Sequence, residues 1–221
     1  MGCYYRVAGS GLRGWRWRRV STVFIVDDDE AVRDSLQWLM RSVGLPSRTF
    51  RSASAFLAEY DRTAPGCLLL DIRMPGMSGL ELQERLIHDG ITLPLLFITG
   101  HGDVPMAVRA LKAGALDFIE KPFNDQELLD RVQRALARDQ EQRVEAAQAL
   151  AARERLARLT PREREVLDRV VAGTLNKVMA DELGVSQKTI EAHRAKVMQK
   201  LEARSVSDLV RMVMLDNYSR R

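Results

Sequence analysis

The sequence predicts an α/β domain with a doubly wound, five-stranded parallel sheet, joined by a helical linker to a small all-α domain of four helices. Three observations support this. Short apolar runs alternate with amphipathic segments over residues 22–138. Residues 139–157 are rich in Ala, Arg, Glu and Gln and lack Gly and Pro, which favours a helix. Residues 158–221 show helical patterns alone.

The composition is that of an ordinary globular protein, with 221 residues, 46% hydrophobic and 29% charged. Two cysteines, Cys3 and Cys67, exclude a disulfide scaffold and a multi-cysteine zinc module. No apolar run approaches the roughly 18 residues of a membrane span, so we expect a cytoplasmic protein with no membrane partner. The net charge of +4 hides an acidic middle region between two basic ends.

Residues 1–21 form a basic extension containing Gly and Trp, with no periodic pattern, and we expect it to be disordered. No apolar segment follows its arginines, which argues against an export signal. Two further interpretations stay open: contact with a nucleic acid or membrane surface through Trp15 to Arg19, and a native start at Val20.

The strands of the α/β domain are expected to be short and buried, at Thr22–Val26, Ser47–Phe50, Cys67–Leu70, Leu95–Ile98 and Leu116–Glu120. The helices between them are expected at residues 31–43, 53–60, 78–89, 104–113 and 125–138. In the first helix one apolar face carries Val32, Leu36, Leu39, Met40 and Val43, and Gly44 follows its end. Right-handed crossovers then give one parallel sheet.

Polar side chains follow four of these strands. Asp27, Asp28 and Asp29 come after the first strand, Asp71 after the third, Thr99 after the fourth and Lys121 after the fifth. Each has a purely structural explanation, such as a helix N-terminus or a turn. Because ligands of doubly wound sheets bind beyond the carboxyl ends of the strands, their joint occurrence predicts a functional site.

The chemistry of this group favours phosphoryl transfer to a carboxylate. Clustered carboxylates bind Mg²⁺, and a metal-bound carboxylate can act as the nucleophile. We predict that Asp71 accepts the phosphoryl group and that Lys121 and Thr99 bind its oxygens, because the developing charge needs such partners. The expected Mg²⁺ ligands are Asp27, Asp28, Asp71 and the backbone carbonyl of Arg73.

Residues 22–138 resemble the receiver domain of two-component response regulators, which has a flavodoxin-like fold. The motifs in order are Asp27-Asp28, Asp71-Ile72-Arg73-Met74-Pro75, Thr99 and Lys121-Pro122. Residues 99–108 further resemble the FixJ-type branch. The resemblance implies a cis Lys121-Pro122 bond and a switch made of Thr99 and Phe118, with Phe in place of the commoner Tyr.

In the linker, apolar residues follow a rough helical pattern that is broken at residues 139–143. They are Leu129, Val132, Leu136, Val144, Ala147 and Leu150. We expect a solvated connecting helix. A dimerising coiled coil stays open as an alternative, although fewer than three clean heptads are present.

The all-α domain begins with strong helix-start signals: Thr160 as the cap, Pro161 at the first position and Glu163 closing a capping box. Further helices are expected at Val178–Leu183, Gln187–Leu201 and around Ser205–Leu215, with Gly184 at the turn and Ser186 capping the third helix. This short joint between two helices is typical of a DNA-binding helix-turn-helix.

The third helix is expected to bind duplex DNA. The predicted DNA contacts are Lys177, Lys188, Thr189, Glu191, Ala192, His193, Arg194, Ala195, Lys196 and Lys200. Glu191, Ala192, Arg194 and Ala195 are placed to face base edges, and the other polar side chains to face phosphates. The alternative is a helical bundle with a solvated basic face.

Residues 159–215 are similar to the LuxR-type domain, through the run from Leu159 to Leu167, Asn176-Lys177 and the run from Thr189 to Arg194. Both resemblances together imply a regulator of the NarL/FixJ type: not an enzyme, but a transcription factor, in most such proteins an activator. The implied partners are a histidine kinase, DNA, RNA polymerase and, after phosphorylation, a second copy of the chain. Two competing hypotheses are a haloacid-dehalogenase-like phosphatase using Asp27 and Asp29, and a DNA-binding protein independent of phosphorylation.

Overall fold

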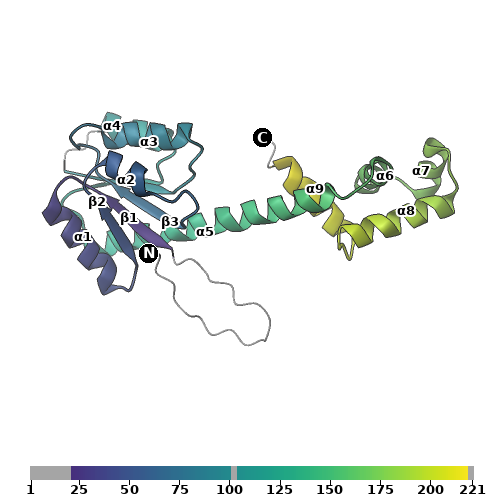
Figure 1. The fold of residues 1–221 in the computed structure, drawn as a ribbon, viewed down its shortest axis with the longest axis horizontal. Coiled ribbons are helices and arrows are strands. Elements are labelled where there is room, and N and C mark those ends of the chain that lie inside the picture. The colour runs from purple at the N-terminus through teal and green to yellow at the C-terminus, as the bar shows by residue number, and fades with distance from the viewer. Residues whose placement is uncertain (1–20, 101–103, 219–221) are drawn as a thin grey trace. The chain divides into compact units, whose positions relative to one another are not determined.

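The computed structural model describes residues 21–100 and 104–218 (Figure 1). Residues 1–20 of the basic N-terminal extension and residues 101–103 of the FixJ-type run lie outside the described residues. The chain divides into two compact units between Glu141 and Gln142, and each is described by itself.

The first unit contains the predicted sheet. Its strands are β1 (Thr22–Val26), β2 (Ser47–Phe50), β3 (Gly66–Leu70), β4 (Leu95–Thr99) and β5 (Asp117–Glu120). All neighbouring strands are parallel, in the order β2-β1-β3-β4-β5. β3 and β4 are buried over their whole length, which explains their continuous apolar sequences. This topology confirms the predicted fold class.

Helices cover both faces of the sheet. They are α1 (Glu30–Ser42), α2 (Ala53–Glu59), α3 (Gly79–His88), α4 (Val104–Lys112) and α5 (Asp125–Leu156). One apolar layer joins the sheet to α2, α3 and α4, and the other joins it to α1 and the first turns of α5 (Figure 1). The two layers pack on opposite faces of the sheet and so fix the strands and the positions of their carboxyl ends.

The first helix differs from the prediction at both ends. Asp29 caps it through a 2.9 Å bond to the Ala31 N–H, so α1 starts at Glu30. The prediction that Val43 lies on the apolar face is wrong, because this side chain is 46% exposed. The helix has already ended at Ser42, and Val43 leaves the helical path as the C-terminal cap.

α5 is one continuous helix that extends through most of the predicted linker. Its first turns bury Leu128 and Val132 against the sheet, whereas Val144 and Leu150 are exposed. Asp139 is buried between these regions and accepts a 2.9 Å hydrogen bond from the Gly66 N–H at the start of β3. The apolar pattern of α5 is therefore interrupted where Asp139 contacts the amino end of β3.

The second unit contains the end of α5 together with α6 (Pro161–Val171), α7 (Asn176–Leu183), α8 (Gln187–Lys200) and α9 (Val206–Tyr218). Its core residues are Leu156, Val166, Leu167, Val170, Met179, Ala180, Ile190, Val197, Leu201 and Leu209. Leu156, assigned to the linker by sequence, is part of this core. Within the described ranges, no helix combines the length and apolarity that crossing a membrane requires.

The helix-start signals of the second unit are confirmed in part. Thr160 and Glu163 form the predicted capping box at α6. α7 begins two residues earlier than predicted, at Asn176, and its cap position is Leu175, whose side chain makes no capping hydrogen bond. Gly184 ends α7 with φ 64°, a left-handed conformation that favours glycine.

Candidate functional site

The structure brings the predicted strand-end residues of the first unit together. Asp27, Asp71 and Thr99 are 3%, 7% and 1% exposed at the ends of β1, β3 and β4. The Asp71 N–H donates to the Val26 carbonyl over 2.8 Å, which continues the pairing of β1 and β3 beyond the last strand residue. The two carboxylates are thus held by neighbouring strands.

Lys121 connects the two carboxylates. Its Nζ lies 2.8 Å from Oδ2 of Asp27 and 3.4 Å from Oδ1 of Asp71. Burial raises the pKa of Asp71, and the nearby charge of Asp27 adds to this effect, although Lys121 opposes it. Burial acts to lower the pKa of Lys121, but hydrogen bonds and charges from both carboxylates outweigh it, so this pKa is raised. The single ammonium group of Lys121 therefore neutralises the two carboxylates only in part, and the site keeps a net negative charge.

Backbone contacts orient both carboxylates. Oδ1 of Asp27 accepts the Asp29 N–H, and Oδ2 of Asp71 accepts the Arg73 N–H, each over 2.9 Å. Consequently Oδ1 of Asp71 is the oxygen on the side of Lys121. Asp28 is exposed at the same edge of the sheet.

Arg33 is a supporting residue that the sequence reasoning missed. Its guanidinium donates to the carbonyl oxygens of Asp27 and Asp28, both over 2.9 Å. It lies in the first turn of α1, a few residues after Asp27 and Asp28. This closeness in sequence could have indicated the contact. The contact fixes the backbone that carries the predicted metal ligands.

The Lys121-Pro122 bond is cis, as the resemblance implied. The Lys121 N–H donates to the Thr99 carbonyl over 2.8 Å, which continues the pairing of β4 and β5. Phe118, on β5, is half-buried and packs against the apolar layer that includes α3 and α4. The two predicted switch residues therefore lie on adjacent strands.

Gly79 is a second residue whose importance the sequence reasoning missed. A Cβ at this position would lie 2.2 Å from the backbone oxygen of Asp71, and the Gly79 N–H donates to the Ile72 carbonyl over 2.9 Å. Ser78 and Glu81 form a capping box at the same helix start. The start of α3 therefore packs directly on the Asp71 loop, and glycine permits this approach.

The residues present fit a magnesium ion. In residues 21–100 and 104–218, no three His, Cys or acidic side chains gather into a ready set of ligands. Mg²⁺ does not need such a set, because it binds proteins through one or two carboxylates and keeps several waters. Two buried carboxylates share the single ammonium of Lys121, which leaves a net negative charge for a hard cation.

In the second unit, most of the predicted DNA contacts lie on an exposed surface. The exposed ones are Lys177, Lys188, Glu191, Ala192, Ala195 and Lys196. Thr189 is half-buried, with its hydroxyl 2.9 Å from that of Ser186. His193 is also half-buried, and no described residue bonds to its buried Nδ1.

Arg194 and Lys200 are instead engaged within the unit. Arg194 donates from Nη1 to Oδ1 of Asn176. Lys200 lies 2.6 Å from Glu163, whose pKa falls to about 2 because of this bond and the Thr160 N–H. The structure thus separates these two residues from the exposed positive charges of α8.

The family model described as "Response regulator receiver domain" matches residues 23–133. The model described as "Bacterial regulatory proteins, luxR family" matches residues 157–213. The response regulator TodT of Pseudomonas putida is 47% identical over 194 residues, which cover 88% of this chain and 86% of TodT. The transcriptional regulatory protein FixJ of Bradyrhizobium diazoefficiens is 43% identical over 192 residues, covering 87% and 94%. The chain belongs to the NarL/FixJ family of response regulators.

A solved structure supports this assignment for both units of the response regulator. The response regulator StyR has a TM-score of 0.79 and 46% identity, and the match covers 88% of this chain and 98% of StyR. The chain is therefore a two-component regulator with a receiver domain and a LuxR-type DNA-binding domain, which implies a role in transcription.

Proposed function

We propose that this response regulator controls transcription through phosphorylation of Asp71 by a histidine kinase, and that phosphorylation promotes DNA binding as a homodimer. The observation that carries the proposal is the shared position of Lys121 between Asp27 and Asp71. The role is that of a regulator, most simply an activator, and not of an enzyme with turnover.

Asp71 has the geometry of a nucleophile. One carboxylate oxygen is occupied by the Arg73 N–H, so Oδ1 forms the new O–P bond while the P–N bond of the donor phosphohistidine breaks. The imidazole leaves and takes up a proton. Lys121 and the hydroxyl of Thr99 then bind the oxygens of the transferred group, because each supplies a donor at the neighbouring strand end.

Asp27, Asp28, Asp71 and the backbone carbonyl of Arg73 would hold Mg²⁺. When bound, this ion supplies positive charge that neutralises the phosphoryl oxygens. Burial and the charge of Asp27 raise the pKa of Asp71, and a cation held here would oppose that shift. Lys121 alone leaves one of the two buried carboxylates without full compensation.

Thr99 and Phe118 would pass the change to the rest of the receiver domain. Thr99 is buried next to the site, and Phe118 is half-buried on the adjacent strand. When the Thr99 hydroxyl moves toward a phosphoryl oxygen, the space beside the Phe118 ring changes. The ring can then repack, which carries a local change at the site to the rest of the domain. Dimerisation and contact with RNA polymerase would follow.

DNA binding would use the exposed cations Lys177, Lys188 and Lys196 for phosphates. Glu191 accepts hydrogen bonds and Ala192 and Ala195 offer methyl groups, so these exposed side chains suit base edges in the major groove. Since its partners are a kinase and chromosomal DNA, the proposal places the protein in the cytoplasm.

The test is phosphoryl incorporation from a phosphorylated kinase domain or acetyl phosphate, with Mg²⁺. Asp71→Asn should abolish the labelling while the circular dichroism spectrum is unchanged, and the exposed Asp130→Asn variant should label like the wild type. Labelling of the Asp71→Asn variant would show that another residue is the acceptor. Repeated hydrolysis of a phosphate ester would instead favour the phosphatase hypothesis.

A further inference from the structure

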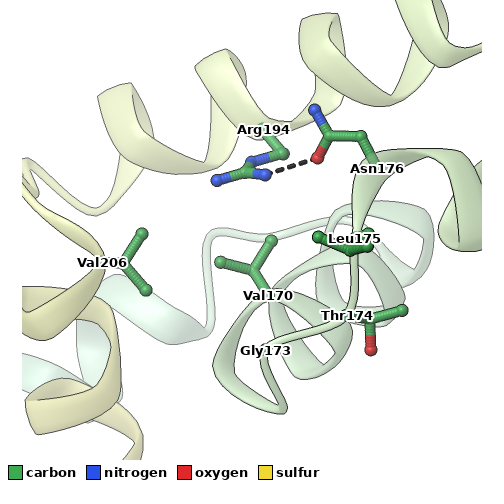
Figure 2. A pocket seen from close by; sticks show the side chains of 7 residues that line it. All are labelled: Val170, Gly173, Thr174, Leu175, Asn176, Arg194 and Val206. Carbon is green, nitrogen blue, oxygen red and sulfur yellow. Dashed lines mark hydrogen bonds between the residues drawn. The ribbon is translucent and has the colours of Figure 1, made fainter.

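Arg194 is half-buried and bonded within the DNA-binding unit, unlike the exposed cations of α8. Figure 2 shows its guanidinium directed at Asn176, to which Nη1 donates a hydrogen bond. The two side chains line a pocket of about 490 Å³. The other lining residues are Val170, Gly173, Thr174, Leu175 and Val206. The pocket therefore joins α6, the turn after it, and the starts of α7 and α9 to the middle of α8.

The helical period of α8 explains this position. At about 100° per residue, Arg194 lies about 40° from Ile190 and about 60° from Val197 around the helix axis. Both of these side chains belong to the core, with exposures of 0% and 1%. Ala192 lies about 160° away from Arg194, and it is exposed. Arg194 thus lies nearer to the core side of α8 than Ala192 does, and it is half-buried.

The start of α7 lacks a side-chain cap, and its first residue is bonded to α8. Leu175 occupies the cap position and makes no side-chain capping bond, so the first turn is not held by a cap of the kind seen at α6 and α8. Asn176 is the first residue of α7, and its side chain is bonded across to α8. Lys177, which follows directly, is exposed.

We propose that Arg194 is a positioning residue for DNA recognition: it ties the start of α7 to α8 and so places Lys177 relative to the reading face of α8. That face is Lys188, Glu191, Ala192, Ala195 and Lys196, without Arg194. The proposal rests on the proposed DNA contacts of α7 and α8. It replaces the prediction from sequence that Arg194 faces base edges.

The test compares variants of the full-length chain binding to two duplexes, one selected by the wild type from a random library and one of random sequence. Arg194→Ala and Asn176→Ala should each weaken binding to both duplexes by about tenfold, because each removes one side of a charge-assisted hydrogen bond. The double variant should bind like either single variant, since the two act through one contact. Arg194→Gln keeps an N–H donor without the charge and should recover part of the affinity.

Two readouts separate positioning from direct contact. The slope of log affinity against log salt should be the same for Arg194→Ala and Asn176→Ala, because both variants release the same contact, whereas Lys196→Ala should reduce it by about 1 in either background. The sequence preference in a repeated selection should also be unchanged in Arg194→Ala. Thermal unfolding of each variant shows whether binding is measured on folded protein. If Arg194→Ala does not fold, Asn176→Ala alone is compared with the wild type.

The outcomes are distinct. A lower salt slope for Arg194→Ala, with Asn176→Ala binding like the wild type, would make Arg194 a phosphate contact and overturn the proposal. A changed base preference at one position would make it a base contact, with the same consequence. Wild-type affinity in both single variants would also overturn it. Failure of the wild type to bind either duplex would count against the proposed function itself.

Discussion

The ammonium nitrogen of Lys121 is closer to Asp27, at 2.8 Å from Oδ2, than to Asp71, at 3.4 Å from Oδ1. Lys121 therefore makes the closer ion pair with Asp27 and the longer, weaker one with Asp71. This asymmetry suits a nucleophile, because a carboxylate oxygen committed to a short ion pair is less available to attack phosphorus.

Lys121→Met should destabilise the receiver domain at neutral pH. The substitution keeps much of the side-chain length but leaves two buried carboxylates without their cation. Because Lys121 is 22% exposed, we expect a loss of about 1–3 kcal/mol in the free energy of unfolding, below that of a fully buried pair. Added Mg²⁺ should stabilise the variant more than the wild type in thermal unfolding. Equal effects of Mg²⁺ on both proteins would contradict the predicted cation site.

Asp71→Asn should make the protein more stable at pH 7. Burial raises the pKa of Asp71 in the folded state above its ordinary value of 3.8, so the folded state binds more protons between these two values. Stability is lost as the pH rises through the folded pKa, and the neutral amide avoids this loss. The advantage of the variant should shrink as the pH falls toward 3.8. A difference in melting temperature that stays constant from pH 7 to pH 4 would argue against this.

Gly79→Ala should impair the receiver domain even though alanine favours helices. The new Cβ would lie 2.2 Å from the Asp71 carbonyl oxygen, so the Asp71 loop or α3 has to move. We expect a loss of about 1–3 kcal/mol and slower phosphoryl incorporation. Gly100→Ala is the matched control, because no described atom lies within 4 Å of its added Cβ. Similar behaviour of the two variants would rule out the packing explanation.

Lys200→Met should lower stability and leave the salt dependence of DNA binding unchanged. Its bond to Glu163 is the first cause of a pKa of about 2 for that carboxyl, below the ordinary 4.5. The resulting stability is present above pH 4.5 and is lost as the pH falls through about 2. We expect a cost of about 1 kcal/mol at pH 7 that decreases toward pH 3. Lys196→Ala should show the opposite result: unchanged melting temperature and a lower salt slope.

Local patterns predicted the fold well. The apolar runs of β3 and β4 are buried throughout, and the capping box of Thr160 and Glu163 forms as expected. The convergence of Asp27, Asp71 and Lys121 could also be predicted, because parallel strands bring their carboxyl ends to one edge. These features depend on periodicity and strand direction, which neighbouring residues encode.

Sequence alone was less informative about residues on the third helix of the DNA-binding unit. All cationic side chains there were predicted to contact DNA, yet Arg194 bonds to Asn176 and Lys200 to Glu163. The spacing of Ile190, Arg194, Val197 and Leu201 was a signal for the first of these, since it marks one side of a helix. The second had no local signal, because Glu163 lies 37 residues away.

The amino-acid pattern was thus sufficient for the sheet, the helix-turn-helix and the residue types gathered at the strand ends. Packing between distant segments was needed to show how Lys121 is shared, why residue 79 is glycine, and that α5 ends in the core of the second unit. The physical reason is that secondary structure follows from neighbouring residues, whereas the partner of a charged side chain depends on which segments the folded chain brings together.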